Sequence, residues 1–66
     1  MRIVLNGDNV ETKNGSSIAG LLTQLDLGTE RVAVEVNHDI VPRATYETHV
    51  LEDGDRVEIV HFVGGG

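Results

Sequence analysis

The chain has 66 residues and a formal net charge of −6, from 11 acidic and 5 basic side chains, and it contains no cysteine. This length supports one small domain, and the negative charge opposes the phosphate backbone of nucleic acids. Without cysteine the chain can form no disulfide, thiolate metal site, iron–sulfur cluster or persulfide of its own.

The N-terminal residues predict a β-hairpin. Residues 2–6 are mostly aliphatic, as in a half-buried strand, and residues 9–13 follow as the returning strand. Between them lies Asn6-Gly7-Asp8, whose residue types tolerate positive φ in a tight turn. We therefore expect two antiparallel strands at the start of the chain.

A helix is predicted over residues 17–26. Four apolar residues recur at i, i+3, i+4 and i+7, which places them on one helix face: Ile18, Leu21, Leu22 and Leu25. The hydroxyl of Ser16 or Ser17 would accept a hydrogen bond from a first-turn N–H. Gly28 would end the helix.

The second half of the chain predicts extended segments separated by turns. Val32, Val34 and Val36 alternate with other residues at the period of a strand that has one face inward. The expected order is a strand at 32–36, a turn at 37–39, a short edge strand at 40–42, an extended piece at 49–51, a turn at 53–55 and a last strand at 56–63.

This order of elements indicates an α+β protein of the β-grasp (ubiquitin-like) class. We expect a mixed sheet of four to five strands with one main helix packed on one face. If the first and last strands lie side by side and parallel, the helix is part of the crossover between them. Residues 1–63 would form the β-grasp domain and residues 64–66 a flexible glycine tail.

Gly64, Gly65 and Gly66 are the strongest functional signal. Glycines lack Cβ atoms and cannot build a core, so after a last strand they would form a thin arm that can thread into a partner's active site. The α-carboxylate of Gly66 can attack the α-phosphate of ATP on an enzyme that binds both. An equally simple interpretation is a frayed end with no function.

The last strand has more apolar residues than one helix can cover. Val57 and Ile59 share one alternating face, and Val60 and Phe62 share the other. If the first pair packs under the helix, the second pair lies on the open side of the sheet, with Val4 from the neighbouring strand. These three residues would form a partner-docking face. Burial of both faces by a twisted sheet is the alternative.

No metal site or enzyme active site is predicted. His38, His49 and His61 are too far apart in sequence for local ligand spacing, so we interpret them as structural or surface side chains. Asp53 and Asp55 flank Gly54 and are typical of a turn rather than of paired catalytic carboxylates.

No secretory signal is apparent, and no apolar run is long enough to cross a bilayer. We therefore expect no membrane partner, and a cytoplasmic location. Nucleic acid is not expected as a partner either, because of the negative charge.

Four segments carry a resemblance to a known family. They are Asn37, residues 40–43 (Ile-Val-Pro-Arg), residues 53–60 (Asp-Gly-Asp-Arg-Val-Glu-Ile-Val) and residues 61–66 (His-Phe-Val-Gly-Gly-Gly). With these segments the chain resembles the ThiS family of sulfur carriers in thiamine biosynthesis. The match covers the whole chain in length and order, and its specific part is the second half.

The resemblance implies a function for the glycine tail. A ThiF-like enzyme would use MgATP to adenylate Gly66, a sulfur-donor protein would convert it to a thiocarboxylate, and a ThiG-like thiazole synthase would receive the sulfur. The chain would be a protein cosubstrate without a cofactor of its own. Alternatives are a small subunit of molybdopterin synthase, a ubiquitin-like modifier, and an interaction module with an inert tail.

Overall fold

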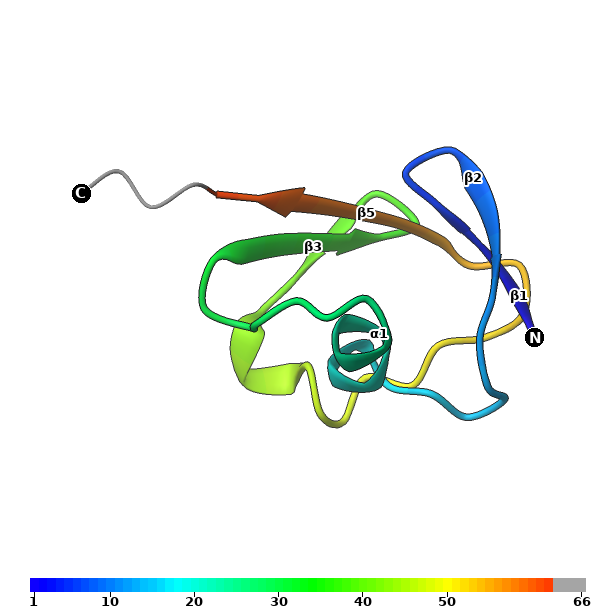
Figure 1. Ribbon diagram of the computed structural model, residues 1–66, viewed down its shortest axis with the longest axis horizontal. Coiled ribbons are helices and arrows are strands. Elements are labelled where there is room, and N and C mark those ends of the chain that lie inside the picture. The colour runs from blue at the N-terminus through cyan, green and yellow to red at the C-terminus, as the bar shows by residue number, and fades with distance from the viewer. Residues whose placement is uncertain (63–66) are drawn as a thin grey trace.

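The computed structural model describes residues 1–62, which form one five-stranded mixed sheet and one α-helix (Figure 1). In chain order the elements are β1 (Arg2–Leu5), β2 (Asp8–Glu11), α1 (Ile18–Gln24), β3 (Val32–Val36), β4 (Asp39–Val41), the 3-10 helix η1 (Arg43–Thr45) and β5 (Arg56–His61). The last strand ends at His61, so Phe62, which the sequence placed in this strand, lies just beyond it, and residue 63 lies outside the described residues.

The order of strands in the sheet is β2-β1-β5-β3-β4. The two strands from opposite ends of the chain, β1 and β5, lie side by side and parallel, and every other neighbouring pair is antiparallel. Both α1 and η1 lie on the same side of the sheet, so the other side is left without a covering element among residues 1–62 (Figure 1). The β-grasp architecture expected from the sequence is confirmed.

Both hairpins turn through residues with positive φ. In the first, Asn6 has a φ of 48° and Gly7 a φ of 88°, as the Asn-Gly pair predicts. In the second, Asn37 and His38 have φ values of 51° and 74°, and Asp39 already belongs to β4. Positive φ at two successive positions matches the twist of the flanking strands.

The helix begins as predicted but ends differently. The hydroxyl of Ser17 caps α1 by accepting a hydrogen bond from the N–H of Gly20 at 3.1 Å. The expectation that Gly28 ends the helix is wrong. Asp26 takes the left-handed conformation with φ 59°, and the N–H of Leu27 donates to the carbonyl of Leu22 at 2.8 Å. This is a Schellman ending with aspartate where glycine is usual.

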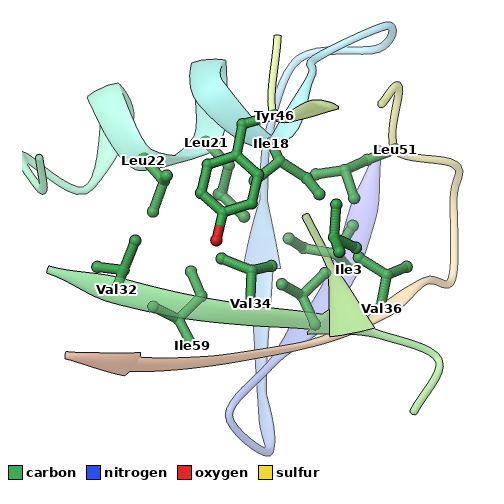
Figure 2. Packing of buried hydrophobic residues seen from close by; sticks show 12 residues of the cluster. Ile3, Ile18, Leu21, Leu22, Val32, Val34, Val36, Tyr46, Leu51 and Ile59 are labelled. Atoms are coloured by element: carbon green, nitrogen blue, oxygen red, sulfur yellow. The ribbon is translucent and has the colours of Figure 1, made fainter. Parts of the chain in front are cut away.

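A cluster of buried apolar residues fills the space between α1 and the sheet (Figure 2). The helix contributes Ile18, Leu21 and Leu22, all with no exposed surface, and β3 contributes alternate valines such as Val34. Tyr46, which follows η1, places its ring between helix and sheet and is 3% exposed. Neither η1 nor this role of Tyr46 is apparent from the sequence pattern.

Residues 49–51 form a single β-bridge between Val50 and Ser17 rather than a strand. The bridge joins this segment to the start of α1, and the N–H of Leu51 donates to the carbonyl of Ser16 at 2.8 Å. No helix within residues 1–62 has the length and apolar character needed to cross a membrane.

Candidate functional site

The two faces of β5 differ in exposure as the alternation of its residues predicts. Val57 and Ile59 point toward α1 and are 0% and 9% exposed. Val60 and Phe62 lie on the open side of the sheet and are 59% and 49% exposed. Large apolar side chains on an uncovered sheet face are a common feature of protein-docking surfaces.

The register of β3, β4 and β5 shows which residues accompany Val60 on this side. Ala33 lies opposite Val60, Glu35 lies opposite Glu58, and Ile40 of β4 lies opposite Glu35. Ile40 is 77% exposed, the largest value among the exposed large apolar residues. The apolar surface therefore extends from β5 toward β3 and β4, an extension that the sequence does not reveal because it depends on strand register.

Val4 also alternates with a buried residue, Ile3, and so belongs to the open side of the sheet. It is half-buried, and its partner in β5 is Arg56 rather than Val60. Arg56 and Val60 are four residues apart in β5, which corresponds to about 13 Å along the strand. Val4 thus lies at the opposite end of β5 from Phe62.

Two asparagine side chains hold β5 in place from its two sides. Asn6 Oδ1 accepts from the N–H of Ile59 at 2.8 Å, and Asn6 Nδ2 donates to the carbonyl of Ile59 at 3.2 Å. On the β3 side, Asn37 Oδ1 accepts from the N–H of Arg56 at 3.0 Å. The sequence pattern placed Asn6 at the end of the first strand and in the following turn, and Asn37 in a turn. It did not indicate these side-chain hydrogen bonds, because the partners lie far away in the chain.

The end of β5 is anchored to the loop that follows α1. The N–H of Phe62 donates to the carbonyl of Arg31 at 2.7 Å. A shallow open hollow beside this bond is lined by residues 28–31 and by His61. The predicted tail residues Gly64, Gly65 and Gly66 lie outside the described residues, so the structure adds nothing to their assignment.

The aspartates and histidines considered as candidates from the sequence lie in turns and extended segments of the domain. Asp55 Oδ2 accepts from the N–H of Glu52 at 2.8 Å, as expected for a turn residue. Asp53 Oδ1 accepts from the N–H of Arg2 at 2.8 Å, a bond to β1 that the turn pattern does not predict. His38 lies in the β3–β4 turn and His61 in β5. Within residues 1–62, no three side chains of the metal-ligating types gather at one place.

The order of the strands, the one α-helix of residues 1–62 on one face and the apolar residues on the open face define a small β-grasp domain of the ubiquitin-like class. The model of the ThiS family matches residues 3–66, and the chain belongs to this family. The match includes the glycine residues that follow the described part of the chain.

Individual relatives agree with this assignment. The chain is 32% identical to the sulfur carrier protein ThiS of Escherichia coli, and the alignment covers all of both chains. It is 46% identical over its full length to a thiazole synthase of Magnetococcus marinus, but it spans only 20% of that protein. The crystal structure of a thiamine biosynthesis protein (ThiS) from Geobacter metallireducens superimposes with a TM-score of 0.85, with 30% identity and full coverage of both chains.

Proposed function

We propose that this chain is a sulfur carrier for thiazole formation in thiamine biosynthesis, with the α-carboxylate of Gly66 as its reactive group. The observation that carries the proposal is the family match, which continues through residue 66. The alignment with the Escherichia coli ThiS protein, which covers both chains completely, supports it. In this proposal residues 1–63 are the domain and residues 64–66 are the tail.

The proposed chemistry takes place at the tail. On a ThiF-like enzyme with MgATP, the carboxylate of Gly66 attacks the α-phosphate of ATP and releases pyrophosphate. Sulfide (HS⁻) supplied by a sulfur-donor protein then attacks the acyl carbon of the adenylate, displaces AMP and loses its proton, which leaves a thiocarboxylate. A ThiG-like thiazole synthase accepts the sulfur. The carrier is a cosubstrate of these enzymes, and we place these steps in the cytoplasm.

The fold supports this chemistry by giving the tail a defined starting point. Asn6, Asn37 and the Arg31 carbonyl hold β5 along its length, as far as Phe62. We assign Val60, Phe62 and Val4 to partner docking, and Gly64 and Gly65 to threading into the partner. A hydrogen-bonded strand end next to an exposed apolar surface lets an enzyme bind the domain and position a short tail at the same time.

The proposal is tested by incubating the purified protein with a ThiF-like adenylating enzyme, MgATP and a sulfur source, and by measuring its intact mass. Replacement of one oxygen by sulfur, mapped to Gly66 by fragmentation, is the expected result. The same mass measurement shows whether Gly66 has a free carboxylate before the reaction. If a competent enzyme produces neither the adenylate nor the thiocarboxylate, the result would instead favour an interaction module with an inert tail.

A further inference from the structure

Two of the four asparagines precede a glycine, and these pairs, Asn6-Gly7 and Asn14-Gly15, lie in different turns. Asparagine before glycine is chemically labile, because glycine has no side chain to shield its nitrogen. That nitrogen can attack the side-chain carbonyl carbon of the asparagine and close a five-membered ring. The sequence alone makes the two pairs equally reactive, so their surroundings in the fold decide which one reacts.

The side-chain amide of Asn6 is held at both of its polar atoms. Its oxygen accepts from the N–H of Ile59 at 2.8 Å, and its nitrogen donates to the carbonyl of Ile59 at 3.2 Å. Ring closure requires the amide to turn away from β5, so both hydrogen bonds must break first. An aspartate at residue 6 would also place a carboxylate oxygen against the Ile59 carbonyl oxygen, which is repulsive. The fold thus opposes both the reaction and its product at Asn6.

Asn14 and Gly15 lie in the exposed turn between β2 and α1. The turn is closed by a backbone hydrogen bond from the N–H of Ser16 to the carbonyl of Lys13 at 3.1 Å. Among the hydrogen bonds of residues 1–62, none involves the side chain of Asn14. A methyl group added at Gly15 would have no atom within 4 Å, so the space around this glycine is open to water. The amide of Asn14 can therefore turn toward the nitrogen of Gly15 without losing a partner.

We propose that Asn14 is a site of spontaneous deamidation and isomerisation in the folded protein, and that the two hydrogen bonds to Ile59 protect Asn6 from the same reaction. The nitrogen of Gly15 attacks the side-chain carbonyl carbon of Asn14, and the amide nitrogen leaves as ammonia with the proton that Gly15 gives up. Water then opens the ring at one of its two carbonyl groups. The products are aspartate and isoaspartate, and water is the sole co-reactant. The inference is independent of the sulfur-carrier function.

The isoaspartate product changes the main chain just before α1. It adds a methylene group to the backbone of the turn that the Ser16–Lys13 bond closes. The carbonyl of Ser16 also accepts from the N–H of Leu51 at 2.8 Å, and the hydroxyl of Ser17 caps the helix. The turn lies at the opposite end of the molecule from the described end of β5 (Figure 1). Isoaspartate at residue 14 should therefore loosen the start of α1 and leave the end of β5 unchanged.

The experiment incubates the full chain at mildly alkaline pH, once folded and once unfolded in guanidinium chloride, and follows each asparagine by peptide mapping. Alkaline pH accelerates the reaction because the attacking nitrogen must lose its proton. In the folded protein Asn14 should convert about tenfold or more faster than Asn6, because two hydrogen bonds must break at Asn6 alone. In guanidinium chloride the two asparagines should convert at similar rates.

Asn9 and the variant Asn14→Gln are the matched controls. Asn9 is also exposed but precedes Val10, whose branched side chain shields the attacking nitrogen, so it should convert more slowly than Asn14 in both conditions. Glutamine keeps the amide but would have to close a six-membered ring. A methyltransferase specific for isoaspartate, supplied with S-adenosylmethionine, should therefore label the aged wild type at residue 14 and leave Asn14→Gln unlabelled there.

The variant Asn14→Asp separates the added charge from the change in the main chain. The isoaspartate form should melt at a lower temperature than Asn14→Asp, which keeps the normal backbone. Equal melting temperatures would overturn the inferred effect on α1.

Two results would overturn the assignment of the site. Conversion of Asn6 in the folded protein at the rate of Asn14 would show that the bonds to Ile59 give no protection. An unmodified Asn14 in the folded protein, with normal conversion in guanidinium chloride, would show that the folded turn prevents ring closure. Neither result bears on the chemistry proposed for Gly66.

Discussion

The side-chain amide of Asn6 takes the place of a neighbouring strand beside Ile59. It accepts from the N–H of Ile59 at 2.8 Å and donates to the carbonyl of the same residue at 3.2 Å. The register of β1 with β5 stops at Leu5 and Val57, because the chain turns at Asn6 and Gly7 into β2. The side chain of Asn6 thus continues the hydrogen bonding along this edge of β5 beyond the point where β1 ends.

Asn6→Gly should lower the free energy of unfolding by about 1–3 kcal/mol, because both polar backbone groups of Ile59 lose their partner. Glycine is the appropriate replacement since Asn6 has a φ of 48°. The control is His38→Gly, which also lies at positive φ in a hairpin turn, at 74°. Urea unfolding of both variants measures the difference, and equal stability would show that the amide contributes nothing.

Asp26→Gly should raise the free energy of unfolding by about 0.5–1 kcal/mol, since glycine adopts a positive φ without the cost that a side chain brings. Asp26 has a φ of 59° at the end of α1. Gly28→Ala is the companion variant. A methyl group at residue 28 would have no atom within 4 Å and no positive φ to oppose, so it should leave stability unchanged or slightly higher. Loss of stability in Gly28→Ala with no gain in Asp26→Gly would contradict this helix ending.

The parts of the fold that depend on sequence periodicity could be predicted. The helical spacing of Ile18, Leu21 and Leu22 put these residues in the core, where each has no exposed surface. The alternation of β5 correctly separated buried Val57 from exposed Val60. In these cases the spacing of apolar residues along the sequence indicates which side of the helix or strand faces the core.

Features that depend on distant neighbours could not be predicted. The core position of Tyr46 requires η1, which has no periodic signal. The helix ending was missed because Asp26, and not a glycine, takes the positive φ that ends it. The Glu35–Glu58 pair appears only when the register of β3 and β5 is known. The candidate tail was recognised from three glycines that follow the last predicted strand, and the family resemblance implied its chemistry. The position of Ile40 on the open face, in contrast, required the register of the sheet.

Phe62→Ala should weaken binding to the adenylating enzyme while changing the melting temperature little. Its side chain is 49% exposed on the open face, so folding gains only part of its burial energy. Val57→Ala is the opposite case on the same strand, with no exposed surface and an expected cost of about 2 kcal/mol. The two variants are compared by thermal unfolding and by the KM for the carrier. A large fall in melting temperature with unchanged KM would place Phe62 in the core.

Deletion of Gly66 should abolish adenylation and leave the fold intact. Within residues 1–62 the buried apolar cluster extends from Ile3 to Ile59. Glycine has no side chain that could pack against it, so the deletion removes no apolar contact. Removing one glycine moves the carboxylate back by about 3.5 Å, and a displacement of about 1 Å can already cost a hundredfold in rate. The measurement is ATP–pyrophosphate exchange together with a melting curve, and adding a residue after Gly66 gives a second variant with the same expected loss. Normal exchange by either variant, with an unchanged melting temperature, would show that the carboxylate of Gly66 is not the reactive group.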